Sequence, residues 1–206
     1  MKIELQPSQL RAVKSYVQSS PEMLSIEEKI EEIQASAQGF TFQLNGILRA
    51  NLQLVKNSKT LVECLDTCFA GNRINTDLIV YRVCNYREML KTLRGDNYID
   101  IGYMSTSKNI SDTQKFYQNP SFDYEPAFLT INIPAGSEVL NVDDIKDFDN
   151  STYEGEILFR RKSLFTVKIN TELPTADQSE IMGRQTILKF KSFRVIELKF
   201  DRYLTL

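Results

Sequence analysis

Two glutamates, Glu154 and Glu156, stand two positions apart immediately before the apolar residues 157–159. Side chains alternate between the two faces of a β-strand, so residues i and i+2 point the same way. If the stretch begins a strand, both carboxylates lie on one face, about 6–7 Å apart. Two carboxylates at such a distance raise each other's pKa, so the arrangement has a cost. The structural alternative is a solvated strand edge with two glutamates that have no chemical role.

The residue types that are absent from the sequence restrict the kinds of catalysis that are possible. The chain has no histidine, which excludes Ser-His and Cys-His nucleophile pairs and histidine metal ligands. Its three cysteines form no Cys-x-x-Cys pair, and no glycine-rich phosphate loop occurs. We therefore expect no metal and a catalyst built from carboxylate, serine, arginine or tyrosine. Carboxylates suit glycosidic-bond chemistry, since they stabilise an oxocarbenium-like transition state.

Composition indicates a folded, non-membrane protein. Of 206 residues, 42% are hydrophobic and 25% are charged, and the net charge is −2, so no basic field recruits nucleic acid non-specifically. No apolar run approaches membrane-spanning length, and the N-terminal residues lack the apolar core of a signal peptide. We expect a cytoplasmic location, in the producing or the target cell, and no membrane partner.

The pattern of elements predicts an α+β fold in a single domain spanning residues 1–206. Helical periodicity dominates residues 1–75, and β-branched, aromatic runs dominate the β-rich core of residues 76–206. Helices are expected from Pro7, from Ser20 to Gly39, and over 42–55, 60–69 and 88–93. Strands are expected over 78–84, 99–107, 128–133, 139–142, 157–159, 164–169, 186–190 and 193–200, with residues 184–200 forming an added hairpin or edge strand.

Two further polar features interrupt the apolar strands. Arg82 lies inside the first strand, where a charge is costly unless it meets an anion or reaches solvent at a sheet edge. Its guanidinium suits a phosphate or a carboxylate. Ser105, Thr106 and Ser107 end the next expected strand, although such hydroxyl triplets are also common in loops and caps.

In this order, Arg82, Ser105-Thr106-Ser107 and Glu154-x-Glu156 resemble the mono-ADP-ribosyltransferases of the Arg/Ser-Thr-Ser/Glu-x-Glu type. That family includes clostridial actin-modifying toxins, bacterial effectors and phage host-modifying enzymes. Residues 129–142 are similar to its strand-Pro-x-Gly-strand segment, and the segment from Asn45 to Arg49 is similar to its Asn-x-x-Leu-Arg stretch. The resemblance implies a helical part packed on two facing, mostly antiparallel sheets.

The resemblance also implies roles on the NAD side of the reaction. Arg82 would hold an NAD phosphate and brace the site. Ser105 would hydrogen-bond near the catalytic glutamate and the nicotinamide ribose, with Thr106 and Ser107 supporting the strand end. Glu156 would bind the ribose 2′-hydroxyl and stabilise the oxocarbenium ion as nicotinamide leaves.

On the acceptor side, the resemblance implies that Glu154 steers and deprotonates the acceptor. A glutamate there resembles the arginine-modifying branch of the family. Phe148 or Tyr153 would contact the acceptor. Residues 108–125 would form a lid over NAD, with Phe116 as a further contact.

The sequence departs from the family in its basic residues. Many toxin relatives carry a second basic residue directly after the strand arginine, where Val83 stands, and an arginine on a later strand, where Thr130 stands. The NAD phosphates would then rely on Arg49 or on a lid lysine, Lys108 or Lys115, beside Arg82.

These features together predict an NAD-dependent mono-ADP-ribosyltransferase, a glycosyltransferase that modifies an arginine of a target protein. Three alternatives stay open: ADP-ribosylation of RNA or DNA, an NAD glycohydrolase toxin, and an interaction domain without activity. A lone catalytic domain suits a phage enzyme, an injected bacterial effector, or the toxin of a toxin–antitoxin system with an antitoxin or delivery partner.

Overall fold

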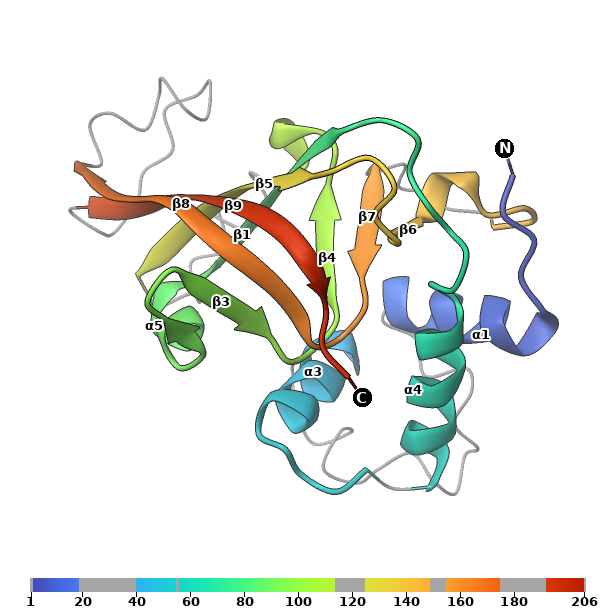
Figure 1. The fold of residues 1–206 in the computed structure, drawn as a ribbon. Coiled ribbons are helices and arrows are strands. Elements are labelled where there is room, and N and C mark those ends of the chain that lie inside the picture. The colour runs from blue at the N-terminus through green and yellow to red at the C-terminus, as the bar shows by residue number, and fades with distance from the viewer. Residues whose placement is uncertain are drawn as a thin grey trace.

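In the computed structural model of the chain, three helices from its first third lie beside one large β-sheet (Figure 1). The structure describes residues 2–18, 40–54, 56–113, 125–148, 155–174 and 192–205. Their helices are α1 (Pro7–Val17), α3 (Phe40–Arg49), α4 (Lys56–Thr67) and α5 (Tyr86–Leu90), with 3-10 turns η2 (Ile110–Thr113) and η3 (Val142–Asp144). The helices expected from Pro7 and over 42–55 and 60–69 are confirmed, with ends shifted by a few residues. The one expected from Ser20 to Gly39 lies outside the described residues.

The helices form their own apolar core. Pro7 occupies the first turn of α1, where its missing N–H costs nothing, and the backbone N–H of Gln6 donates to Gln9 Oε1 at 2.9 Å. Helix α1 packs against α3 and α4, and Leu10 and Val17 of its apolar stripe are partly buried. The fully buried side chains of this core include Ala12, Val13, Tyr16, Leu44, Leu61 and Leu65. None of the helices in the described ranges is long and apolar enough to cross a membrane.

The strands form a continuous nine-stranded sheet in the order β2-β3-β8-β9-β5-β1-β4-β7-β6. Within the described residues, β5 and β9 pair in parallel and every other pair is antiparallel. The α+β class, mostly antiparallel, is confirmed. The strands are β1 (Leu78–Asn85), β2 (Leu93–Arg94), β3 (Asn97–Asp100), β4 (Met104–Ser107), β5 (Pro126–Ile133), β6 (Leu140–Asn141), β7 (Glu156–Phe159), β8 (Ser163–Pro174) and β9 (Ser192–Tyr203).

The sheet bends at the junction of β1 and β4, which are joined by one residue pair, Tyr81 with Ser107. Beyond it, β4 and β7 cross the direction of β8 and β9 (Figure 1). The Phe159 ring of β7 lies 5.4 Å from Phe165 and 5.2 Å from Phe200, centroid to centroid. The two facing sheets implied by the resemblance are therefore two halves of one curved sheet with an apolar core between them.

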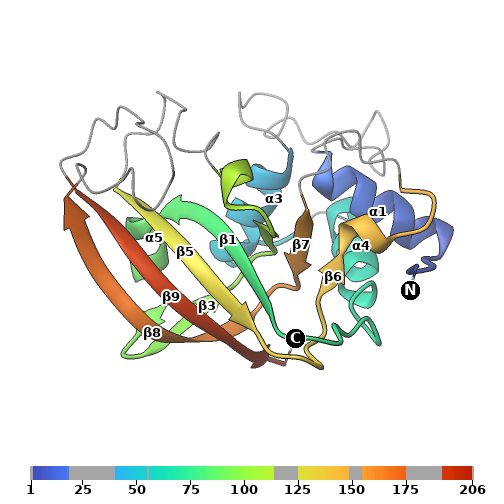
Figure 2. The ribbon, with the colours of Figure 1, turned by 90° about the horizontal axis from the view of Figure 1, so that it is seen from above.

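Strands β4 and β7 are covered on both faces. Met104, Ile157 and Phe159 point into the core between the two halves of the sheet. Tyr103 and Leu158, which alternate with them, point into the core of the helices. Seen from above, α3 lies between the α1–α4 pair and β1 (Figure 2). The strands that carry Ser105 and Glu156 thus run between the helices and the larger half of the sheet.

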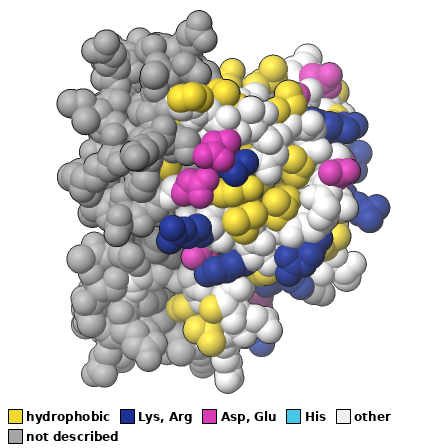
Figure 3. Space-filling model, turned by 90° about the vertical axis from the view of Figure 1, so that its left-hand side faces the viewer, with side chains coloured by type: hydrophobic (Ala, Val, Ile, Leu, Met, Phe, Trp, Pro, Cys, Tyr) yellow, Lys and Arg dark blue, Asp and Glu magenta, His cyan; other side chains and the backbone are white. Residues whose placement is uncertain are grey.

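The outer face of the larger half is less covered. Ile79 on β1 and Ile169 on β8 are exposed, together with Leu52 and Leu90 elsewhere. Figure 3 shows one side of the molecule, where hydrophobic side chains gather between Lys and Arg side chains. Arg82 shares its face of β1 with Val80 rather than with Ile79, since side chains alternate. Arg82 therefore projects to the inner side of the sheet.

Three sequence-based expectations about elements are wrong in detail. The strand expected over 99–107 is two strands, β3 and β4, because the Asp100 carboxylate accepts a bond from the Gly102 N–H at 3.0 Å and bends the chain. The helix expected over 88–93 ends at Leu90, and Leu93 begins the β2–β3 hairpin. The strand expected at the edge, β9, lies between β8 and β5. Its alternate residues, Ile196 and Leu198, are fully buried, which an edge position would not provide.

Candidate active site

Glu156 and Ser105 lie on adjacent strands and are hydrogen-bonded. The Ser105 hydroxyl donates to Glu156 Oε1 at 2.5 Å. In the β4–β7 ladder, Ser107 pairs with Glu156, so Ser105 is its diagonal neighbour on the same face. Only 6% of Glu156 is exposed. The hydroxyl fixes one carboxylate oxygen of a glutamate that is held at a strand start and largely removed from solvent.

Arg82 joins this pair from the neighbouring strand β1. Its Nη1 donates to the backbone carbonyl of Ser105. Three consecutive strands of the sheet, β1, β4 and β7, thus bring Arg82, Ser105 and Glu156 together. The sequence-based expectation that these three residues share a site agrees with this placement.

The other two hydroxyls of the triplet have bonds that support the strand end. Thr106 is buried, and its Oγ1 donates to the carbonyl of Ile157 at 2.7 Å. Ser107 Oγ donates to Asp112 Oδ2 at 2.8 Å and accepts from the Asn109 N–H at 2.9 Å. These bonds attach β4 to β7 and to the turn η2.

Gly155, directly before Glu156, has a backbone conformation unlike that of the strand. Strand β7 begins at Glu156, and Gly155 has φ +58°, a left-handed conformation that favours glycine. The regular strand therefore begins at Glu156 and does not include Gly155. Glu154 and Tyr153 lie outside the described residues, as do Lys115 and Phe116.

Lys108 lies over Gly155 and connects two loops. Its N–H donates to the Gly155 carbonyl at 2.9 Å, and a Cβ on Gly155 would lie 3.2 Å from Lys108 Cε. Lys108 Nζ lies 2.7 Å from Asp143 Oδ2 and 3.3 Å from Asn141 Oδ1. The ammonium expected to be available for a phosphate is therefore paired with Asp143.

The half-buried ring of Phe148 packs against the helical core.

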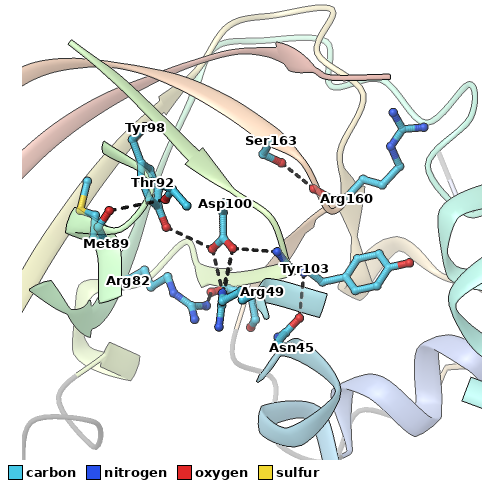
Figure 4. A network of polar contacts seen from close by, with 12 residues as sticks. Asn45, Arg49, Arg82, Met89, Thr92, Tyr98, Asp100, Tyr103, Arg160 and Ser163 are labelled. Atoms are coloured by element: carbon cyan, nitrogen blue, oxygen red, sulfur yellow. Dashed lines mark hydrogen bonds and ion pairs between the residues drawn. The ribbon is translucent and has the colours of Figure 1, made fainter. Parts of the chain in front are cut away.

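Arg49 is held by Asp100 in a two-point contact (Figure 4). Arg49 Nε and Nη2 lie 3.1 and 3.0 Å from Asp100 Oδ1, and Nη2 lies 3.1 Å from Oδ2. Burial alone would lower the pKa of Arg49, but the Asp100 carboxylate outweighs this and holds that pKa above its usual value. The guanidinium therefore stays charged beside a carboxylate that is 2% exposed.

A buried polar network attaches the helices to the start of β4. The Tyr103 N–H donates to Asn45 Oδ1 at 2.8 Å, and Asn45 Nδ2 donates to the Tyr16 hydroxyl at 2.7 Å. That hydroxyl donates to the Tyr103 carbonyl at 3.1 Å. Burial raises the pKa of Tyr16 above its usual value, so the hydroxyl stays protonated and remains a donor.

Sequence reasoning missed Asp100 and Tyr16 as neighbours of the site. Asp100 offered a signal, since it is a carboxylate between Ile99 and Ile101 in an expected strand. Tyr16 offered no such signal, because a tyrosine in the apolar stripe of an amphipathic helix is usually an ordinary core residue. In the described part of the chain, no group of three or more Cys, Asp or Glu side chains could hold a metal ion.

Three solved structures of bacterial exoenzymes and toxin components are similar to this chain. Exoenzyme S from Pseudomonas aeruginosa, solved with human 14-3-3 protein beta and Carba-NAD, superposes with a TM-score of 0.58 over 94% of this chain and 74% of its own. The C3 exoenzyme of Clostridium limosum gives 0.59 over 98% and 88%, and C2-I of the Clostridium botulinum C2-toxin gives 0.60 over 96% and 44%. Each is 16% identical to this chain, so these likenesses define the fold.

Sequence comparison defines the family. The model of the ADP-ribosyltransferase exoenzyme family matches residues 4–189 of the chain, while no curated protein matches it. The chain belongs to the ADP-ribosyltransferase exoenzyme family and is an NAD-dependent mono-ADP-ribosyltransferase. The resemblance based on Arg82, the hydroxyl triplet and the Glu-x-Glu stretch is confirmed.

Proposed function

We propose that the protein acts as a toxin that transfers ADP-ribose from NAD to an arginine side chain of a target protein. The observation that supports this most directly is the buried Glu156 carboxylate, which accepts a hydrogen bond from the Ser105 hydroxyl at 2.5 Å. Arg82 bonds the backbone carbonyl of the same serine. Glu154, two residues earlier, supports a protein arginine as acceptor because it supplies a second carboxylate for the incoming nucleophile.

In this proposal, NAD binds through its pyrophosphate to Arg82 and Arg49. Guanidinium groups suit phosphate because they are planar, permanently charged and able to donate two parallel hydrogen bonds. Glu156 accepts a hydrogen bond from the 2′-hydroxyl of the nicotinamide ribose. Its negative charge, held in place by Ser105, then stabilises the positive charge that develops at C1′.

The reaction breaks the bond between C1′ of the ribose and the nicotinamide nitrogen. The bonding electron pair leaves with nicotinamide, which departs neutral, and the ribose becomes an oxocarbenium ion. Free arginine has a pKa of about 12.5–13.8, so its guanidinium is a poor nucleophile until it gives up a proton. Glu154 takes that proton, and the arginine nitrogen supplies the electron pair of the new bond to C1′.

The test is incubation of the protein with adenine-labelled NAD and a target-cell lysate, followed by protease or nuclease digestion. We expect the label in macromolecules that protease degrades and nuclease does not, with mass spectrometry locating it on arginine. The Glu156→Gln variant is the control and should transfer no label. Label released by nuclease would replace this proposal with nucleic-acid modification, and label found only in free ADP-ribose would replace it with NAD glycohydrolysis.

A further inference from the structure

Asp100 is a buried carboxylate at the bend between β3 and β4. Its side chain is 2% exposed and receives bonds from Arg49, from the Gly102 N–H at 3.0 Å and from the Tyr98 hydroxyl at 3.2 Å. A buried charge is costly unless it is paired and hydrogen-bonded, and this one is both. Asp100 therefore stabilises the bend that leads into β4 and also holds Arg49 of α3.

The contact with Arg49 is one-sided. Asp100 engages Nε and Nη2, while 36% of the Arg49 side chain remains exposed. Nη1 is the guanidinium nitrogen that Asp100 does not engage. A two-point contact fixes the plane of a guanidinium, whereas a single contact leaves it free to rotate. Arg49 thus has one edge fixed in the protein and its other edge turned away from Asp100.

Arg49 and Arg82 lie in the same part of the molecule (Figure 4). Both act electrostatically on Cys84, whose pKa burial raises to about 11, and both act on Tyr16. Two guanidinium groups repel each other unless carboxylate or phosphate lies between them. Asp100 pairs with Arg49, while Arg82 bonds the uncharged Ser105 carbonyl. A phosphate between the two guanidinium groups would relieve their repulsion.

Helix α3 is positioned against β4 by the same bend. Asn45 and Arg49 are four residues apart on α3 and so share one face of the helix. Asn45 accepts from the Tyr103 N–H, and a Cβ on Gly102 would lie 2.6 Å from Asn45 Oδ1. Asp100 and Asn45 therefore place Arg49 relative to the strand that carries Ser105.

We propose that Asp100 is a positioning residue for NAD binding, which orients the Arg49 guanidinium before the dinucleotide arrives. The proposal rests on the proposed role of Arg49 as a phosphate ligand. An arginine oriented in advance does not lose its rotamer freedom on binding, so the gain appears in NAD affinity. A purely structural ion pair would instead contribute to stability alone.

The test is a double-mutant cycle with Asp100→Asn and Arg49→Ala, measuring carba-NAD affinity by calorimetry. Asparagine keeps an oxygen for the Gly102 N–H and can donate to the Tyr98 hydroxyl, so the bend is retained. It loses the charge and the second acceptor that fix Arg49. We expect Asp100→Asn to weaken carba-NAD binding on the order of tenfold in the parent and less than about twofold in Arg49→Ala.

The matched control is a partly buried two-point pair, in which Arg161 donates to Asp66 through Nε at 2.9 Å and Nη2 at 2.7 Å. Asp66→Asn should lower thermal stability and leave carba-NAD affinity unchanged. Equal losses from Asp100→Asn in the parent and in Arg49→Ala would overturn the proposal, since Asp100 would then act through the fold. An unchanged affinity in Arg49→Ala would instead remove Arg49 from the proposed function.

A second variant, Arg49→Lys, tests the same inference from the other partner. Lysine keeps the charge and one contact with Asp100, but it has no planar group to orient. We expect its carba-NAD affinity to match that of Arg49→Ala within about threefold. Parental affinity in Arg49→Lys would overturn the proposal, and this variant provides the answer even if Asp100→Asn does not fold.

Discussion

The Ser105 hydroxyl and the Glu156 carboxylate are 51 residues apart in sequence and 2.5 Å apart in space. Their contact is diagonal across the β4–β7 ladder, in which Ser107 and Glu156 are directly paired. A shift of register by one residue would turn Ser105 to the opposite face and break the contact. The geometry of Glu156 therefore depends on strand pairing and on the bonds of Thr106 and Ser107 that secure it.

Glu156→Gln should abolish NAD cleavage while preserving the fold, because it removes the charge but keeps the shape. By analogy with other groups that stabilise a transition state electrostatically, we expect a loss of about 10²–10³ in kcat. Ser105→Ala should cost about tenfold, as expected for one hydrogen bond to a charged group. Nicotinamide release and thermal melting would be measured together. An active Glu156→Gln enzyme would contradict the assignment.

Glu154→Gln should separate transfer from hydrolysis. Water captures an oxocarbenium ion with less help than a protonated guanidinium, so nicotinamide release without a protein target should persist. Transfer to the target should be lost. The two rates would be followed in the same preparation by chromatography and by label in protein. Parental transfer by this variant would exclude an arginine acceptor handled by Glu154.

Arg82→Lys should weaken NAD binding by about tenfold, because an ammonium cannot bond the Ser105 carbonyl and a phosphate with the same planar geometry. The matched control is Arg73→Lys, since Arg73 makes an exposed pair with Glu138 at 3.3 Å. Calorimetry with carba-NAD should show no change for the control. Equal affinities for both variants would remove Arg82 from phosphate binding.

Gly155→Ala should reduce both stability and activity. The left-handed backbone costs an L-residue about 1 kcal/mol or more, and the new methyl group would lie 3.2 Å from Asn109 and Lys108. Gly136→Ala is the control, since Gly136 also has a positive φ of +83° but has open space for a Cβ. We expect similar losses of melting temperature and a loss of activity in Gly155→Ala alone.

Lys108→Met should loosen the two loops that meet over Gly155. The pair with Asp143 is partly buried, so we expect a loss of about 1 kcal/mol in the free energy of unfolding and a lower kcat. Lys146→Met, which breaks the exposed pair with Glu4, should change neither quantity measurably. Equal behaviour of the two variants in denaturant titration and turnover would show that Lys108 has no special role.

The features that sequence reasoning anticipated are those whose signal is local. Arg82 stood out because a charge interrupts an apolar strand, and Glu156 because it directly precedes one. The α1 stripe and the β1 run are visible in sequence because burial imposes a period on them. These signals made Arg82 and Glu156 candidates without any knowledge of which strands pair.

The features that sequence reasoning missed depend on distant partners or on one backbone angle. Asp100 acquires its role from Arg49, 51 residues earlier. The positive φ of Gly155 is a conformation that glycine permits and does not require, so the residue type alone could not reveal where the strand begins. The sequence predicts β9 as an added edge strand because no local pattern indicates its partner. That partner, β5, is distant in sequence, since Ala127 pairs with Arg194.

The central place of β9 has a consequence for biosynthesis. Its parallel pairing with β5 and antiparallel pairing with β8 connect β2, β3 and β8 to the strands that carry Arg82, Ser105 and Glu156. A ribosome-bound chain that has not yet exposed residues 192–203 holds two incomplete sheets with unpaired edges on β5 and β8. The two parts of the sheet can therefore join only after β9 has been synthesised, and until then their unpaired edges favour aggregation.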